Sequence, residues 1–435
     1  MTSQQQDSDE GHGRQRDPEV RDRDRDDARD VVGEQPVGIP GHTETMSHPR
    51  NRPGGTGLAI TPTVIDRGDT VPPAADERLT RLLERTVDRR RVHHVNLAIV
   101  GGDGRHWSGA AGAADAHGTS LRPDTPFFVA SVTKRFIITL VLQAHERGEL
   151  HLDAPITTYL PAWVTQGLHV YRRQDHTGDI TVRHLASHTS GLPDHFEKPR
   201  QGRSLFADLK AGNDRAWTFE DVVQMAKEDH RPHFPPQDLT ATRQRARYSD
   251  TGFQLLIHTV ETVTGRTYAQ LLTERITEPH GLAHTWLPGQ TEPLATTPAP
   301  SVLFARDRPL DLSRMIASCN DLVSTNQDLL RFQRALLAGE LFRDTATVAL
   351  LTERANRLRN AFPLRYGLGT MIFHVGRLNA PGIRPMTLVG HSGATGTWLF
   401  HCPELDLHLV GTIDQADGRT QPFRLMVRML RAWAG

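Results

Sequence analysis

The chain lacks several features that would indicate particular classes of protein. Its 435 residues include only two cysteines, Cys319 and Cys402, far apart in the sequence. This usage favours buried, reduced thiols over a disulfide framework. No apolar run reaches about 18 residues, so no membrane span is expected. Because the formal net charge is zero, the composition gives no reason to expect nucleic acid or an anionic membrane as partner.

The first part of the chain also lacks the residues that build a core. Residues 1–57 contain no leucine, phenylalanine, tryptophan or tyrosine, and Arg21 to Asp30 reads RDRDRDDARD. Such a segment cannot bury enough apolar surface to order itself, so we expect a disordered charged tail over 1–57 and a linker over 58–76. The start has no apolar core of a secretory signal, which predicts a cytoplasmic location. Met46 offers a second candidate translation start.

Lysine is scarce, and one lysine has an informative neighbour. The 51 basic residues include only four lysines, and Lys134 follows Ser131 by three positions at the start of an apolar segment. Residues at i and i+3 share a helix face, so this amine can reach the serine hydroxyl. Serine is a poor nucleophile without a neighbouring base, and lysine, unlike arginine, can lose its proton. Alone, the S-x-x-K spacing is a weak signal.

Strand signals lie at both ends of the folded part, with helical signals between them. Two apolar runs around an Asp-Gly turn predict a β-hairpin over Val95 to Gly101 and His106 to Gly112. A mostly apolar segment predicts a buried helix from Thr133 to Gly148. Ser324 with Gln327 forms a candidate capping box for a helix over Asp328 to Leu337. Further expected strands lie at 366–375, 386–390, 396–402 and 405–413, and expected helices at 182–192, 253–263, 268–276 and 421–433.

This order predicts an α+β fold rather than a βαβ array. The N-terminal hairpin should pair with the C-terminal strands in one antiparallel sheet flanked by helices, with a large, mostly helical insertion at about 150–330. Two further stretches can then converge on Ser131. Tyr248-Ser249-Asp250 supplies a phenol that relays protons when a cation helps it to ionise. His391-Ser392-Gly393 supplies a strand end with a glycine that lets a substrate lie against the backbone.

The three stretches, in this order, resemble the active-site elements of the serine β-lactamase and penicillin-recognising hydrolase superfamily, most closely its class C and esterase-like branch. The resemblance covers 77–435 and implies one β-lactamase-like serine hydrolase domain there. Its motifs are TPFFVASVTKRFIITLVLQAHERGELHLDAPITTYLP, ITVRHLASHTSGLPDH, RYSDTGFQLLIHTVETVTGRTY, NDLVSTNQDLLRFQRALL, YGLG and GHSGATG. We expect no cofactor and no metal, since no metal-ligand spacing such as H-E-x-x-H occurs and the 23 histidines are scattered.

The resemblance assigns roles to individual residues. It implies Ser131 as the nucleophile, Lys134 as the adjacent base and Tyr248 as the residue that passes a proton to the leaving group. His391-Ser392-Gly393 stands where the family has a lysine-threonine-glycine strand motif. It also implies an oxyanion hole formed by the backbone N–H groups of Ser131 and Ala394. Such donors typically lower the barrier by about 3 to 4 kcal/mol.

Two departures from the family pattern bear on the substrate. Asp250 replaces a common asparagine, and it can pair with Lys134 and keep that amine charged, which shifts the role of base toward Tyr248. His391, mostly neutral at pH 7, replaces a lysine that binds a substrate carboxylate. Together they disfavour acidic substrates by about 1 to 3 kcal/mol. We therefore expect esterase-like hydrolysis of neutral small-molecule esters or amides.

Several alternatives stay open from the sequence. The same acyl-serine can serve an acyltransferase, a β-lactamase or a D-alanyl-D-alanine carboxypeptidase, and a catalytically dead binding domain is a further class. GHSGA at 390–394 resembles a nucleophile elbow with Ser392, but too few residues follow it for that fold. We interpret His188 to Gly191 as a structural turn, and Asp321 and Asp328 as helix-start residues. The segment 401–408, HCPELDLH, is interpreted as part of a strand pair rather than a cluster of metal ligands.

Overall fold

The computed structural model describes residues 71–87, 92–376, 384–416 and 418–434. All of them belong to one compact unit, Gly57–Gly435. The predicted tail, 1–57, lies outside the described residues, as does most of the predicted linker. Helix α1, Pro73–Val87, begins within the last residues of that linker.

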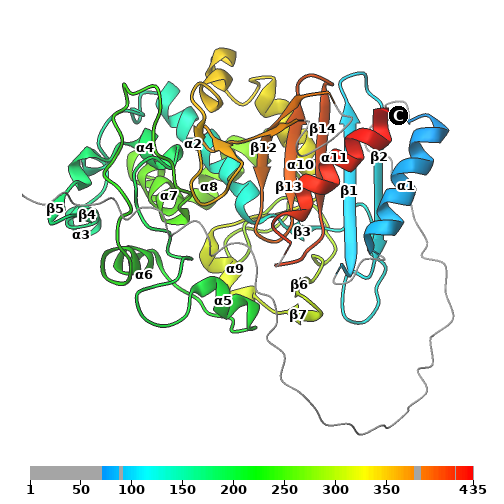
Figure 1. The fold of residues 1–435 in the computed structure, drawn as a ribbon, viewed down its shortest axis with the longest axis horizontal. Helices are drawn as coiled ribbons and strands as arrows, with labels where there is room; N and C mark the ends of the chain where they lie inside the picture. Colours follow the sequence, from blue (N-terminus) through cyan, green and yellow to red (C-terminus); the bar gives the residue numbers. More distant parts are fainter. Residues whose placement is uncertain (1–70, 88–91, 377–383, 417, 435) are drawn as a thin grey trace, which may run out of the picture. The chain divides into compact units, whose positions relative to one another are not determined.

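An eight-stranded antiparallel sheet forms the centre of the unit (Figure 1). The N-terminal hairpin joins the C-terminal strands through β1 and β14, where Asn96 pairs with Thr412. This arrangement confirms the predicted fold class. In spatial order the strands are β2 (His106–Gly112), β1 (His94–Gly101), β14 (Leu407–Thr412), β13 (Trp398–Cys402), β12 (Met386–Ser392), β11 (Met371–Val375), β10 (Arg365–Tyr366) and β9 (Asn356–Arg357).

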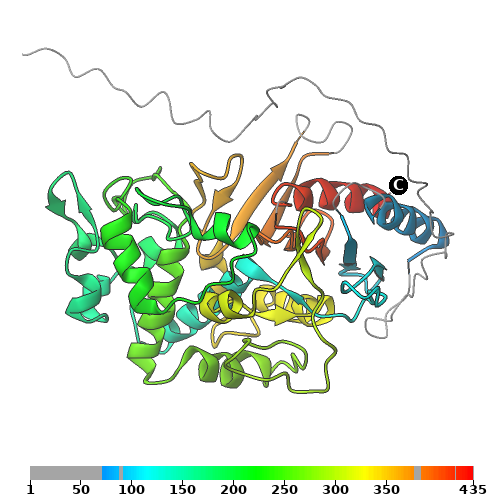
Figure 2. The ribbon, with the colours of Figure 1, turned by 90° about the horizontal axis from the view of Figure 1, so that it is seen from below.

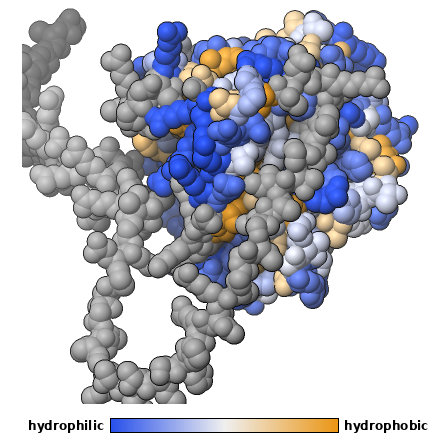
Figure 3. Space-filling view, turned by 90° about the vertical axis from the view of Figure 1, so that its right-hand side faces the viewer, coloured by the Kyte–Doolittle hydropathy of each residue, from blue (hydrophilic) through white to orange (hydrophobic). Residues whose placement is uncertain are grey.

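Helices cover both faces of the sheet. Helix α11, Gln421–Ala434, packs on β14 and on α1, while α10, Asn326–Leu337, packs on β1, β13 and β14. Figure 2 shows α10 and α11 on opposite sides of the sheet. Helix α1 buries its apolar side through residues such as Leu79 and Leu83. The described surface on that side of the molecule is mostly hydrophilic, as expected for an amphipathic outer helix (Figure 3).

The regular elements between the two sets of sheet strands are mostly helices, as predicted. Three small two-stranded sheets interrupt it, of which β3 (Phe127–Phe128) with β8 (Val323–Ser324) is the one next to Ser131. The others are β4 (Val170–Tyr171) with β5 (Gln174–Asp175) and β6 (Leu303–Ala305) with β7 (Arg308–Leu310). The helices are α2 (Lys134–Glu146), α3 (Ala162–Thr165), α4 (Val182–Ala186), α5 (Leu205–Lys210), α6 (Phe219–Gln224), α7 (Asp250–Thr264), α8 (Tyr268–Leu272) and α9 (Ser313–Cys319).

The predicted cap of α10 is wrong by one residue. Thr325, not Ser324, caps the helix, and its hydroxyl accepts a hydrogen bond from the Asp328 backbone N–H at 3.2 Å. Ser324 is instead extended in β8, where it pairs with Phe127. Ser324 therefore cannot cap the helix, because it is part of a strand.

The structure also bears on two expectations drawn from composition, the state of the cysteines and the membrane spans. Cys319 and Cys402 are both buried and unpaired, as predicted. Among the helices that the structure describes, none is long and apolar enough to cross a membrane.

Candidate active site

Ser131 lies in a short 3₁₀ turn, Ala130–Thr133, that leads directly into α2. Ala130 has φ 48°, in the left-handed region that a residue with a Cβ rarely adopts. The surrounding chain holds this turn: the Val129 N–H donates to the Leu322 carbonyl at 2.9 Å, next to the β3–β8 pair. Ser131 is partly exposed, whereas its neighbours in the turn are buried. Strained backbone of this kind is concentrated at functional sites.

The structure brings Ser131, Lys134 and Asp250 together. The Lys134 Nζ donates to the Ser131 Oγ at 3.3 Å, and it forms an ion pair with the Asp250 Oδ1 at the start of α7. Lys134 is 3 % exposed, so its charge is held away from bulk water. The i, i+3 spacing thus has the geometry that the sequence indicated.

The charge of Lys134 follows from opposing effects. Burial lowers the pKa of its ammonium, but attraction to Asp250 and Asp321 outweighs burial and holds the pKa above its ordinary value. For Asp250, burial raises the pKa and Lys134 lowers it, and the net shift is downward. The pair is therefore ionised at pH 7, and Lys134 is a cation beside the nucleophile.

Tyr248 lies at the same centre. The Lys134 Nζ lies 5.1 Å from the centroid of the Tyr248 ring. The Tyr248 hydroxyl has no hydrogen-bond partner among the described residues, although the Ser131 hydroxyl is close enough to lower its pKa. Burial and the Asp250 charge raise that pKa further than Ser131 lowers it, so the resting phenol is neutral.

His391 is placed differently from a group that points at a substrate. Its ring is fully buried, and its Nδ1–H donates to the Ser392 carbonyl at 2.8 Å. Its Nε2 accepts from the Tyr366 hydroxyl at 2.9 Å, so both ring nitrogens have partners. Burial and the Lys134 charge hold the pKa of His391 well below its usual value. The neutral His391 ring lies behind Tyr248, with the two ring centroids 6.2 Å apart.

Gly393 explains how the end of β12 reaches Ser131. A Cβ at this position would lie 2.9 Å from the Val129 carbonyl oxygen and 3.0 Å from the Ala130 Cβ. The glycine therefore permits close contact with the turn that carries Ser131. The expected approach of a substrate to this backbone stays a prediction. Ala394 follows, and it is the one partly exposed residue within the buried stretch 391–400.

Two carboxylic acids of the centre were missed in the sequence. Asp321, expected at a helix start, lies near Lys134 and Thr133; burial raises its pKa to about 7 although Lys134 lowers it. Asp194 is buried near Asp250, and burial and that charge raise its pKa well above the ordinary value. No local pattern marks either residue, because long-range packing places both.

The turn that contains His188 supports Tyr248. His188 has φ 58°, and its Nδ1 accepts a hydrogen bond from the Ser249 N–H at 3.3 Å. Its ring packs between Tyr248 and Tyr366, with centroids 4.4 and 4.3 Å away. The structural interpretation of this turn agrees with these contacts, and the turn also fixes the position of the phenol.

Comparison with known proteins places these observations in a family. The beta-lactamase family matches residues 79–425, most of the chain. The chain belongs to the beta-lactamase family. The family predicted from the sequence motifs is therefore confirmed.

Relatives and solved structures of this family carry several names. The chain is 28% identical over 196 residues to penicillin-binding protein 4 of Amycolatopsis lactamdurans, covering 44% of this chain and 45% of the relative. It is 38% identical over 120 residues to esterase EstB of Burkholderia gladioli, covering 26% and 28%. A D-stereospecific amidohydrolase from Streptomyces sp. superposes with a TM-score of 0.64 at 26% identity, covering 82% of this chain and 98% of that one.

The chain spans 45% and 28% of these two curated relatives, and 64% of a third. The names describe a penicillin-binding protein, an esterase and an amidohydrolase. The family and the reaction class expected from the sequence, serine hydrolysis, agree with these names, whereas the names do not share one substrate.

Proposed function

We propose that the protein is a serine hydrolase that cleaves ester or amide bonds through an acyl-Ser131 intermediate. The observation that carries the proposal is the buried Lys134 ammonium, 3.3 Å from the Ser131 Oγ and paired with Asp250. A serine hydroxyl beside such a charge, with a phenol near it, has what nucleophilic attack on a carbonyl requires. The esterase and amidohydrolase names among the relatives support this reaction class.

We assign proton transfer to Tyr248 and electrostatic support to Lys134. Because the resting phenol is neutral, the reactive form is the one in which Tyr248 has first lost its proton to solvent. As the Ser131 oxygen bonds to the substrate carbonyl carbon and the carbonyl π electrons move to its oxygen, the Ser131 proton passes to the Tyr248 phenolate. Tyr248 then gives that proton to the leaving group. Lys134 stabilises the phenolate because Asp250 keeps the ammonium charged. The backbone N–H groups of Ser131 and Ala394 are the proposed donors to the developing oxyanion.

The charges around Ser131 favour substrates without a nearby negative charge. Asp250 neutralises the Lys134 ammonium, burial favours the protonated forms of Asp194 and Asp321, and the neutral His391 adds no cation. A carboxylate next to the scissile bond would therefore find the Lys134 charge already paired. Neutral substrates do not need such a cation.

A matched series of p-nitrophenyl esters tests the substrate class. The butyrate is neutral, the monosuccinate carries a carboxylate and the 4-aminobutyrate carries an ammonium at similar acyl length. We expect kcat/KM for the monosuccinate to be at least about tenfold below that for the butyrate, equivalent to about 1.4 kcal/mol. Ser131→Ala should abolish turnover of all three esters. An equal rate for the monosuccinate and the butyrate would contradict the substrate class, and activity in Ser131→Ala would contradict the nucleophile.

Acyl transfer is the second candidate, because it uses the same acyl-Ser131. An assay of products with and without an added alcohol or amine separates the two reactions: hydrolysis gives the free acid in both, whereas transfer gives a new ester or amide. The domain limits at 77–435 and the cytoplasmic location stay predictions.

A further inference from the structure

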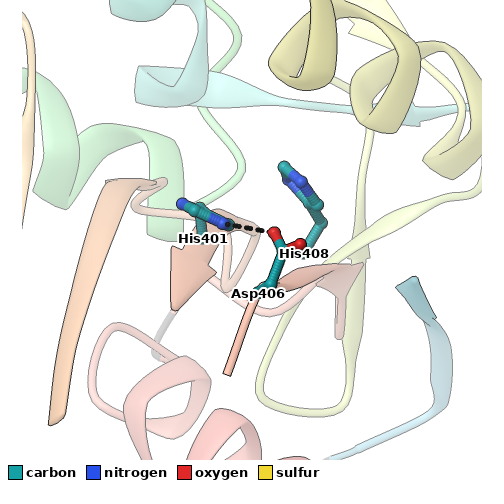
Figure 4. Close-up of side chains that lie close together, drawn as sticks. All are labelled: His401, Asp406 and His408. Atoms are coloured by element: carbon teal, nitrogen blue, oxygen red, sulfur yellow. Dashed lines mark hydrogen bonds and ion pairs between the residues drawn. The ribbon is translucent and has the colours of Figure 1, made fainter. Parts of the chain in front are cut away.

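Two histidines and an aspartate meet at the turn between β13 and β14. His401 and His408 are directly paired across the strands, and their rings stack with centroids 4.5 Å apart. Asp406 lies in the turn, and its Oδ1 is 3.4 Å from the His401 Nε2 (Figure 4). One ligand atom from each of the three residues lies within 4.8 Å of the other two. The strand pair expected over 401–408 is present, and its side chains form the cluster.

The spacing is close to what one metal ion requires. Nitrogen and oxygen ligands bind zinc at about 2.0 to 2.2 Å, so two donors on one ion lie at most about 4.4 Å apart. His401 and Asp406 already meet that limit. The third donor lies within 4.8 Å of both, and binding to one ion requires it to come within about 4.4 Å. Imidazole and carboxylate together suit zinc and its neighbours among the transition metals, whereas magnesium and calcium prefer oxygen alone.

The backbone of Asp406 is held in place by the neighbouring hairpin. Asp406 has φ 49°, and its backbone carbonyl accepts a hydrogen bond from the Gly102 N–H at 2.8 Å. A Cβ on Gly102 would lie only 1.6 Å from the Asp406 Oδ2. The carboxylate thus lies directly beside Gly102. The Asp406 side chain is largely exposed, and the position of its backbone is fixed by the turn after β1.

The buried histidine has a partner that can orient its ring. The Nδ1 of His408 lies 3.5 Å from the Nε2 of Gln333 on α10, and the Gln333 Oε1 has no partner among the described residues. If the Gln333 amide is turned over, its oxygen accepts the Nδ1–H of His408. The Nε2 of His408 then keeps a free lone pair. Ligand histidines in metal sites are commonly held through their other nitrogen in this way.

We propose that His401, Asp406 and His408 form a binding site for a divalent transition-metal ion of the zinc type, with water completing the coordination. The site is separate from the proposed active site. Trp398 pairs with Ser392 at the Ser131 end of the sheet, and His401 lies three residues farther along β13, about 10 Å away. The ion would join the two strands at their turn and would take no part in acyl transfer. Arg334 on α10 faces His408 and opposes a cation, which limits the affinity.

Calorimetric titration of the tag-free full chain with Zn²⁺, and with Co²⁺ as a spectroscopic probe, tests the site. We expect one equivalent of Zn²⁺ to bind to the cluster. His401→Gln, Asp406→Asn and His408→Gln should each weaken that binding at least about tenfold. Gln333→Leu should weaken it less, and Arg334→Gln should strengthen it. Bound Co²⁺ should show visible bands of nitrogen ligation that vanish in the histidine variants.

The chain has 23 histidines, so a matched control is needed. His374→Gln removes a histidine from β11 in the same sheet and should leave Zn²⁺ affinity unchanged. Retained ester hydrolysis shows that each variant is folded. Three results would overturn the proposal: no Zn²⁺ binding to the wild-type chain, unchanged affinity in His408→Gln or Asp406→Asn, or an equal loss in His374→Gln.

Discussion

The Ser131 centre and the β13–β14 turn use histidine in opposite ways within one sheet. At the Ser131 centre, His391 is fully buried, and both of its nitrogens have partners, the Tyr366 hydroxyl and the Ser392 carbonyl. At the turn, His401 is half-buried and its Nε2 faces a carboxylate. The neutral ring of His391 is thus fixed behind the Tyr248 phenol, whereas the side chains at the turn keep possible metal-ligand atoms near solvent. Burial and partners, rather than residue type, decide what each ring does.

The largest expected effect comes from removing the Tyr248 hydroxyl. In Tyr248→Phe we expect kcat to fall by about 10²- to 10⁴-fold, since a positioned proton-transfer group typically contributes that factor. Zn²⁺ affinity at the turn should not change. Steady-state kinetics with a p-nitrophenyl ester measures the loss. Tyr268→Phe is the matched control, because Tyr268 is buried and its hydroxyl, like that of Tyr248, has no partner among the described residues.

The comparison assumes that the Ser131 centre and the β13–β14 turn act independently. His408→Gln should leave kcat/KM within about twofold, as distant sites behave independently. If His408→Gln slowed hydrolysis as strongly as Tyr248→Phe, the two regions would be coupled. If Tyr268→Phe lost as much activity as Tyr248→Phe, the assignment of proton transfer would be contradicted.

The next effect tests the contact between β12 and the Ser131 turn. In Gly393→Ala the new Cβ would lie 2.3 Å from the Thr397 Oγ1 and 2.9 Å from the Val129 carbonyl oxygen. We expect kcat to fall about 100-fold, because a shift near 1 Å in a catalytic group costs that much. Gly178→Ala meets nothing within 4 Å and should leave the rate unchanged. A fully active, stable Gly393→Ala enzyme would show that this close approach does not position Ser131.

The ion pair itself is tested by Asp250→Asn through the pH dependence of kcat/KM. Asp250 raises the pKa of both Lys134 and Tyr248, so its neutral replacement lowers both. Activity requires a deprotonated base, and the wild-type rate should therefore rise into the alkaline range. In Asp250→Asn that rise should move to lower pH by about one unit or more. A profile that does not move would exclude Asp250 as the group that sets the protonation of the base.

The smallest effect concerns stability rather than rate. Burial raises the pKa of Asp321 from 3.8 to about 7, so the folded state favours the protonated acid. Its contribution to stability is full below pH 3.8 and is lost as pH rises through about 7. Asp321→Asn cannot ionise, so between pH 4 and 8 its free energy of unfolding should fall by about 1 to 4 kcal/mol less than that of the wild type.

Urea unfolding at several pH values measures this difference. Asp307→Asn is the control, since the Asp307 side chain is 78% exposed. Parallel pH dependences of the wild type and Asp321→Asn would contradict the burial of an acid beside Lys134.

The sequence predicted what local spacing determines. The S-x-x-K pair, the hairpin around Asp103 and the alternating C-terminal strands follow from neighbouring residues, and the structure contains all three. The order of the strand signals also predicted the pairing of β1 with β14. These features depend on periodicity, which a single sequence displays.

The rest depends on contacts between distant residues. Asp194 and Asp321 come to Lys134 from separate loops, and neither has a recognisable motif. The orientation of His391 depends on Tyr366, 25 positions earlier in the chain. The cap of α10 moved to Thr325 because β8 pairs with β3. The conformation of each of these residues is decided by its tertiary partner rather than by its neighbours.

The central claim is that Ser131 becomes covalently acylated. Intact-protein mass spectrometry after incubation with a panel of small esters, followed by peptide mapping, tests it most directly. We predict an adduct of the acyl mass on Ser131 in the wild type, its accumulation in Tyr248→Phe if deacylation slows more than acylation, and no adduct in Ser131→Ala. Hydrolysis of the esters with the acyl group mapped to another residue, or an adduct that persists in Ser131→Ala, would contradict the account.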